Sequence, residues 1–263
     1  MILPSASARK VDMKDQASVL RETDGEALTL ARTLLRSARY AGLAVIDPAT
    51  GFPFASRVLL GTDIDGVPVI LVSGLSTHTK ALENDPRASL LTGEPGKGDP
   101  LAYARLTTQC LAEPVERGTP LHERIRSRFL NRHVKAKLYI DFPDFRFFRL
   151  QPQSASLNGG FGRAYLVEGA DLMILCSASE ALAAEADRIV QDLVDNHPAL
   201  FSALETSFKG PNGGTCRICG IDCAGFDVIS GDSLARFEFH ENVTNPGEII
   251  QHISKIAYSI PEI

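Results

Sequence analysis

The stretch that decides the fold runs from Ser56 to Leu91 and reads SRVLLGTDIDG (56–66), VP (67–68) and VILVSGLSTHTKALENDPRASLL (69–91). Two apolar runs separated by the turn signal DIDG predict a pair of antiparallel strands. Ser76 and Pro86 bracket a short predicted helix, because serine favours the N-cap position and proline follows a helix end. RASLL then opens another strand, so the segment reads strand, strand, helix, strand.

The flanking sequence adds further short strands and few helices. Asp24 is predicted to cap a helix that Gly42 ends. The remaining predicted elements of this part are a hairpin of strands 42–47 and 54–63, a strand 101–115, a basic helix 122–141 and one or two strands within 145–167. One helix followed by about six strands with short turns predicts a closed barrel rather than a parallel sheet.

The composition changes after about residue 170. Two helices (177–197 and 198–208), three short strands and a closing helix capped by Asn245 form a predicted α+β unit. The fold class is therefore α+β: a six-stranded split β-barrel followed by a small α+β C-terminal domain. We predict a flexible arm at 1–22, a barrel domain at 23–170 and a C-terminal appendage at 178–263.

Composition narrows the class of protein. The 263 residues carry a formal net charge of -5, which argues against general nucleic-acid binding. No apolar run approaches the roughly 18 residues that span a bilayer, and residues 1–18 lack the apolar core of a signal peptide. With five cysteines and no sign of secretion, we predict reduced thiols and a cytoplasmic protein without membrane contact.

The first candidate site combines Arg57 on a strand with Ser76, Thr77, His78, Thr79 and Lys80 at a helix start. A helix N-terminus offers unpaired backbone N–H groups, and hydroxyls and cations around it can complete a phosphate site. The alternative is an ordinary helix cap with surface charges.

The same block resembles the flavin-mononucleotide (FMN) region of pyridoxamine-phosphate-oxidase-like split barrels. The matching residues are Arg57-Val58-Leu59-Leu60, Ser76 to Leu82, and Asp85 to Leu90. The resemblance implies a homodimer with cofactor in clefts between protomers, held near Arg57, Val58 and residues 76–80. Thr77-His78 replaces the family's Arg-Lys pair, and the chain has no Trp. Pyridoxamine 5'-phosphate oxidation itself is therefore excluded.

The second candidate site is NGGFGRA (158–164), in which Gly160 permits close backbone approach and Arg163 follows. A turn at the end of the barrel is the alternative. This motif, together with HTKAL (78–82) and the appendage, resembles the haem-utilisation branch of the split barrels. The resemblance implies haem in the dimer cleft, and some members of that branch open the porphyrin with O2. They often use a C-terminal His as the iron ligand, for which this chain offers His240, His252 or Tyr258.

Cys216, Cys219 and Cys223 have spacing that suits a metal, but the segment also alternates like a strand with buried free thiols. We predict no metal site there. Three functions stay open: a haem-utilisation protein, an FMN-dependent oxidoreductase unrelated to haem, and a non-catalytic regulator of the type that binds glutamyl-tRNA reductase. The sequence assigns no catalytic residue, so whether the protein is an enzyme is undecided.

Overall fold

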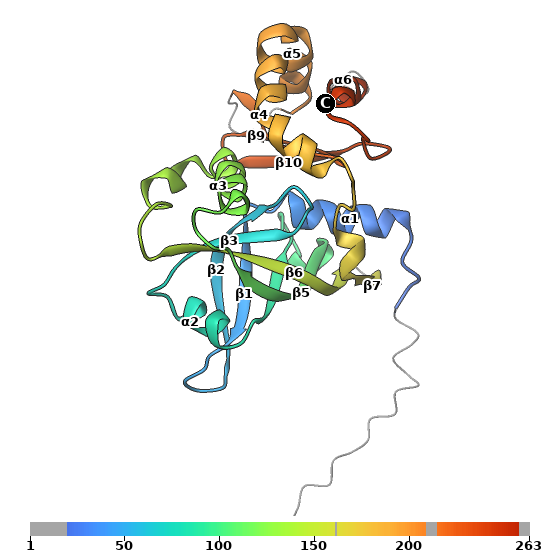
Figure 1. Ribbon diagram of the computed structural model, residues 1–263. Helices are drawn as coiled ribbons and strands as arrows, with labels where there is room; N and C mark the ends of the chain where they lie inside the picture. The colour runs from blue at the N-terminus through green and yellow to red at the C-terminus, as the bar shows by residue number, and fades with distance from the viewer. Residues whose placement is uncertain (1–19, 161, 209–214, 258–263) are drawn as a thin grey trace, which may run out of the picture.

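The computed structural model, which describes residues 20–160, 162–208 and 215–257, contains a β-barrel with a smaller α+β unit packed above it (Figure 1). Six strands follow the order β3-β2-β1-β4-β5-β6, and antiparallel pairing of β3 with β6 closes the barrel. An additional strand, β7, pairs with β6. The bounds are β1 (Tyr40–Ile46), β2 (Pro53–Thr62), β3 (Pro68–Ser73), β4 (Arg87–Thr92), β5 (Arg105–Pro114), β6 (Phe145–Asn158) and β7 (Ala164–Glu168). The predicted six-stranded barrel is confirmed, with one strand added.

Leucines fill the barrel interior because apolar side chains alternate along each strand. Leu43, Leu60, Leu90, Leu106 and Leu150 have no exposed surface. Helix α1 (Gly25–Arg36) and helix α2 (Thr77–Asn84) add alanines and leucines to the same core. Figure 1 shows these two helices on opposite sides of the barrel.

Two helix boundaries differ from those that the sequence predicts. Asp24 does cap α1, because its Oδ1 accepts a hydrogen bond from the Ala27 N–H at 2.8 Å. However, α1 ends at Arg36 and Gly42 lies inside β1, so Gly42 as the helix end was wrong. The predicted basic helix also divides into α3 (Pro120–Arg132) and the 3-10 helix η3 (Val134–Leu138), with the ring of His133 buried at the break.

Helix α3 covers the outer side of β2, β3 and β6. Ile125 and Phe129 pack on Val69, Leu71 and other residues in a second, smaller core. The buried carboxylate of Asp63, just after β2, holds this layer in place. It accepts hydrogen bonds from Nε and Nη2 of Arg124 on α3 at 3.0 and 2.9 Å.

Replacing Asp63 by Asn is expected to lower the free energy of unfolding by about 2 kcal/mol at pH 7. Burial alone would raise the pKa of Asp63, but its hydrogen bond and charge interaction with Arg124 lower the pKa below its ordinary value. A depressed folded-state pKa stabilises the protein above the unfolded pKa, and this contribution is lost as the pH falls through the folded value. Urea titrations should therefore show the difference between the two proteins shrinking below about pH 4. A difference independent of pH would contradict this account.

The C-terminal part forms its own hydrophobic core around a three-stranded sheet of order β10-β9-β8. Its elements are α4 (Ser179–Asn196), α5 (Pro198–Ser207), β8 (Cys216–Asp222), β9 (Gly225–Ser230), β10 (Ser233–Glu238) and α6 (Ile249–Ala257), with the 3-10 helix η5 (Pro246–Glu248) before α6. These elements are called the appendage below. Within the described ranges, no helix is both long enough and apolar enough to cross a bilayer.

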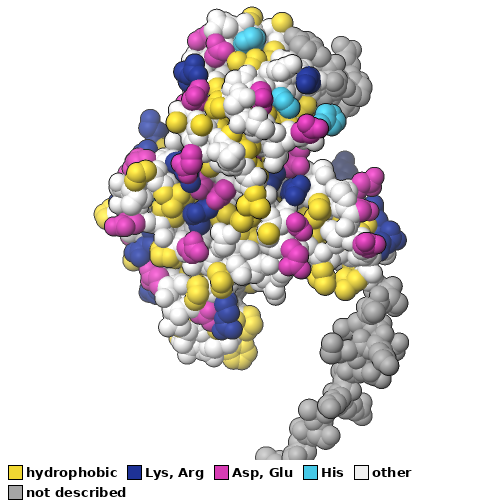
Figure 2. All heavy atoms as spheres, turned by 45° about the vertical axis from the view of Figure 1, so that its right-hand side comes forward, with side chains coloured by type: hydrophobic (Ala, Val, Ile, Leu, Met, Phe, Trp, Pro, Cys, Tyr) yellow, Lys and Arg dark blue, Asp and Glu magenta, His cyan; other side chains and the backbone are white. Residues whose placement is uncertain are grey.

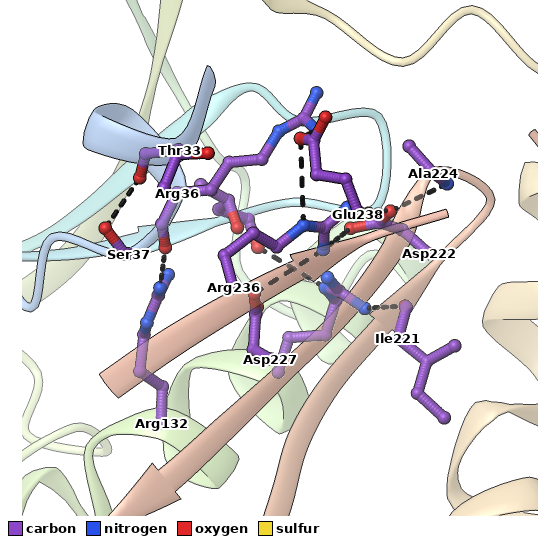
Figure 3. A network of polar contacts seen from close by, with 12 residues as sticks. Thr33, Arg36, Ser37, Arg132, Ile221, Asp222, Ala224, Asp227, Arg236 and Glu238 are labelled. Atoms are coloured by element: carbon purple, nitrogen blue, oxygen red, sulfur yellow. Dashed lines mark hydrogen bonds and ion pairs between the residues drawn. The ribbon is translucent and has the colours of Figure 1, made fainter. Parts of the chain in front are cut away.

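A buried network of charged groups joins the appendage to the barrel (Figure 3). Arg236 on β10 donates to both carboxylate oxygens of Asp222, at 2.6 and 2.7 Å, and lies 3.4 Å from Asp227. From the barrel side, Arg36 on α1 pairs with Glu238 at 2.6 Å, and Arg128 on α3 donates to the carbonyl of Ile221 at 2.7 Å. The network fixes the appendage against α1 and α3.

Candidate functional site

Arg57 lies on the outer face of β2, exposed to solvent, with its guanidinium 5.0 Å from the centre of the Tyr40 ring. This contact is a cation–π interaction and leaves the charge facing outward. No ion pair joins Arg57 to a carboxylate in the described part of the chain, so its charge is available to an anion. The side chain of Val58 points the opposite way and is buried in the barrel core. Only its backbone can meet a ligand on the outer face.

The loop before α2 uses two hydroxyls that a phosphate would require. Ser76 Oγ and Thr79 Oγ1 both donate to the carbonyl of Ser73, at 2.6 and 2.7 Å, and Thr79 is completely buried. Thr77 and Lys80 remain exposed. The helix start therefore presents one cation and one hydroxyl rather than a full cradle.

His78 links this loop to β2. Its Nδ1 lies 3.1 Å from Ser56 Oγ, and its Nε2 lies 2.9 Å from Ser76 Oγ. Partial burial lowers the pKa of His78, which favours the neutral ring. Since both ring nitrogens have hydroxyl partners, His78 positions the residue next to Arg57 rather than offering a free nitrogen to a metal.

The glycine-rich motif forms the turn between β6 and β7. Gly160 has a φ of +98° and lies so close to the carbonyl of Ala102 that a β-carbon would be 2.9 Å from its oxygen. Arg163 is exposed and donates from Nη2 to the carbonyl of Gly159 at 2.6 Å. The turn is thus a structural feature, and it also displays a cation at the end of the sheet.

Arg57 and Arg163 do not meet within one protomer. Arg57 packs on the Tyr40 ring and Arg163 bonds the carbonyl of Gly159, and no contact in the described residues joins the two arginines. On the open side of the barrel, β1, β4 and β5 lie between β2 and β6. In the first motif, His78 joins the loop to Ser56, the neighbour of Arg57, but no contact in the described residues joins Arg57 itself to residues 76–80 or to the second motif.

The outer face between the two arginines carries mostly small or apolar side chains, with Gln109 as a large polar one. Register pairing places one row of residues across the strands from β2 to β6: Ala55, Ala44, Ser89, Gln109 and Ser154. The next row reads Arg57, Gly42, Leu91, Thr107, Ser156 and Leu166. Leu91 and Leu166 are 50% and 60% exposed. We call these two rows the open sheet face.

A hollow of about 560 Å³ lies at one end of the open sheet face, lined by Ala44, Ile46, Ser89 and Leu111 among others. Sequence reasoning missed this surface. The signal was present, since the outward positions of β1 and β4 hold glycine, alanine and serine where a solvated strand would carry charged side chains.

The other candidate ligands lie away from the open sheet face. His240 is exposed beside α1, and His252 packs edge-on against Phe239 at 5.2 Å between ring centres. Tyr258 lies outside the described residues. Cys216, Cys219 and Cys223 are buried, and burial raises the pKa of Cys219 to about 12. In the described part of the chain, no three His, Cys, Asp or Glu side chains are grouped closely enough to hold a metal ion.

Comparison with known proteins identifies the barrel. Residues 22–173 match the family model described as "CREG, beta-barrel". The non-canonical heme oxygenase HOZ of Arabidopsis thaliana is 33% identical over 141 residues, which are 54% of this chain and 41% of the plant protein. The chain thus spans less than half the length of that relative. The heme oxygenase HutZ of Vibrio cholerae is 32% identical over 137 residues, covering 50% of this chain and 75% of HutZ.

Similarity to one solved structure includes the appendage. The protein Atu2129 from Agrobacterium tumefaciens, of unknown function, is 30% identical with a TM-score of 0.76, and the match covers 88% of this chain and 95% of that chain. A match over 88% of this chain extends well beyond the barrel. The arrangement of barrel and appendage therefore recurs in another protein.

Proposed function

The chain belongs to the CREG β-barrel family, and from that premise we propose that it is a haem-binding protein of the haem-utilisation type that works as a homodimer. The similarity to HOZ and HutZ, both described as heme oxygenases, carries this proposal. We place it in the cytoplasm because all five cysteines are free.

Haem fits the open sheet face better than flavin fits the helix start. Haem needs a flat apolar surface for its ring and cations for its propionates. The apolar surface is supplied by Leu91, Leu111 and the small residues around them. The cation is supplied by Arg57. An FMN phosphate would need hydroxyls, but those of Ser76 and Thr79 are bonded to the carbonyl of Ser73.

A homodimer follows from the same surface. Small outward residues let two sheets approach closely, and the exposed leucines gain stability when they are buried. A twofold axis at the open sheet face would bring Arg163 of one protomer toward the Arg57 edge of its partner. The two cations that lie apart in one protomer would then flank one ligand.

When bound, haem supplies redox-active iron, and the named relatives indicate ring oxygenation as the chemistry. The residues of this chain would bind and orient the ligand. Arg57, which packs on Tyr40, would hold a propionate, and the leucines of the open sheet face would exclude water from the ring. His78 holds the start of α2 against β2 through its hydrogen bonds with Ser56 and Ser76.

Arg57→Ala is expected to weaken haem binding about tenfold, because one charge-assisted contact to a propionate is lost. The measurement is haem titration of the purified apoprotein, followed by the Soret band. Arg146→Ala is the matched control, since Arg146 is an exposed strand arginine that is already paired with Glu83 at 2.5 Å and does not line the hollow of the open sheet face.

The proposal is wrong if the protein does not bind haem stoichiometrically. Flavin would then replace haem as the proposed cofactor if the purified protein absorbed near 450 nm, as flavin does (a property of the free cofactor). An equal loss in Arg57→Ala and Arg146→Ala would remove Arg57 from the site while leaving haem binding itself intact.

A further inference from the structure

A second hollow of about 540 Å³ opens between the barrel and the appendage. The barrel contributes Arg39, Leu59 on β2, residues 132–136 and Tyr139. The appendage contributes Arg217 on β8 and the β9–β10 turn. We call this hollow the interdomain cleft. Its volume lies in the range of pockets that hold small organic molecules.

The lining of the interdomain cleft is strongly cationic. Arg39, Arg132, Lys135 and Arg217 face a single carboxylate, that of Asp232. Asp232 is already paired with Arg39 at 2.8 Å. His133 adds no charge at neutral pH, since burial lowers its pKa to about 4. In a chain of net charge -5, three unpaired cations around one hollow create a local field that attracts anions.

The cleft is lined by more cations than carboxylates, unlike the face drawn in Figure 2. On the face shown in Figure 2, lysine and arginine side chains are interspersed with aspartate and glutamate. No carboxylate of the described residues lies within ion-pair distance of Lys135 or Arg217. Each is therefore free to contact a ligand.

Arg132 adds buried positive charge behind the wall of the cleft. Its side chain is buried, yet its one hydrogen bond is to the carbonyl of Arg36, and Nε has no partner (Figure 3). Burial lowers the pKa of Arg132, with only partial compensation from the charge of Asp227. A buried guanidinium without a close carboxylate is costly unless another negative group balances it.

The walls of the interdomain cleft indicate the rest of the ligand. Leu59, Val134 and Ile229 are apolar, and the half-buried ring of Tyr139 stacks at a tilt on Phe145, 4.9 Å between centres. An inorganic ion would leave these apolar side chains in contact with water. A molecule with an apolar body and a negative head satisfies both parts of the lining.

We propose that the interdomain cleft is a second ligand site, which binds an organic anion with an apolar body. It is separate from the proposed haem site, because it is lined by η3 and the appendage rather than by the open sheet face. Leu59 lies two residues along β2 from Arg57, so the two sites are neighbours. The proposal does not depend on haem binding.

The test uses the fluorescent probe 8-anilinonaphthalene-1-sulfonate, an aromatic anion, with the full chain. We expect saturable binding that weakens with added salt. Lys135→Gln and Arg217→Gln should each raise the dissociation constant about five- to tenfold, since each removes one charge-assisted contact. Lys137→Gln is the matched control: Lys137 is also an exposed lysine of η3, but it does not line the cleft.

Two results would overturn the proposal. One is an equal effect of Lys137→Gln and Lys135→Gln, which would mean general charge attraction without a site. The other is haem affinity that falls in Lys135→Gln and Arg217→Gln together with probe binding, which would make the cleft part of the haem site. Failure of the haem proposal would show separately, as absent haem binding with probe binding retained.

Discussion

Replacing Arg236 by methionine is expected to lower the free energy of unfolding by about 3–5 kcal/mol, because it leaves the buried carboxylates of Asp222 and Asp227 without their counter-ion. The side chains of Arg236 and Asp222 are 1% and 2% exposed, so water cannot take the place of the guanidinium. Urea unfolding followed by circular dichroism measures the loss. Arg188→Met is the control, since Arg188 pairs only with Glu185 on the surface and should change stability by less than about 0.5 kcal/mol.

The pH dependence of this loss has a definite sign. Burial alone would raise the pKa of Asp222, but the charge and hydrogen bonds of Arg236 lower the pKa below the ordinary value. In Arg236→Met the carboxyl keeps the burial and loses the arginine, so its folded pKa rises above the unfolded one. The variant therefore gains stability relative to the wild type as the pH falls from 7 toward 4. A loss that stays constant over this range would contradict the assignment.

A triple variant distinguishes the stability lost through unpaired buried charge from the stability lost through packing. Replacing Asp222 and Asp227 by leucine in the Arg236→Met background removes both uncompensated carboxylates, and this should recover most of the lost stability. If the triple variant were no more stable than Arg236→Met, the loss would come from packing rather than from buried charge.

Leu91→Glu is expected to convert the protein to a monomer and to weaken haem binding at least a hundredfold. The residue stands in the middle of the open sheet face, beside Gly42 and Thr107, where an introduced carboxylate would face its symmetry copy across the interface. Light scattering coupled to size exclusion gives the mass, and the Soret titration gives the affinity.

Leu138→Glu is the matched control for this experiment, because Leu138 is also an exposed leucine but lies on η3. It should remain dimeric and bind haem as the wild type does. A wild-type protein that is monomeric at all concentrations, or a Leu91→Glu variant that stays dimeric, would remove the open sheet face as the interface.

The barrel could be predicted because its signals are local. Each signal depends on residues only a few positions apart. They are the alternation of apolar and polar residues around Leu60, the turn DIDG and the helix cap at Asp24. The two helix ends were predicted wrongly because tertiary contacts override the local helix preference there. Gly42 resembled a helix end, yet it forms part of β1 opposite Arg57. The basic helix broke because the ring of His133 turns inward to the carbonyl of Leu60, 2.8 Å away.

The candidate site was predictable only in part. His78 in the 76–80 loop contacts Ser56, the neighbour of Arg57, so the loop lies beside β2. The use of the Ser76 hydroxyl was not predictable, since a cap and a phosphate ligand look alike in sequence. The sequence also gives no local signal of the buried network. Asp222, Asp227 and Arg236 are interior because α1 and α3 pack against this side of the sheet, through Arg36 and Arg128.

Strand β6 pairs with β3, β5 and β7, and it is the last strand of the closed barrel to be made by the ribosome. Its pairing joins residues 69–73 to 145–149, a separation of more than seventy positions. Closing so long a loop lowers the chain entropy, and the contacts that offset this loss form only when the barrel is complete. The first three strands therefore emerge with apolar edges exposed, which makes the nascent chain a client for chaperones until β6 arrives.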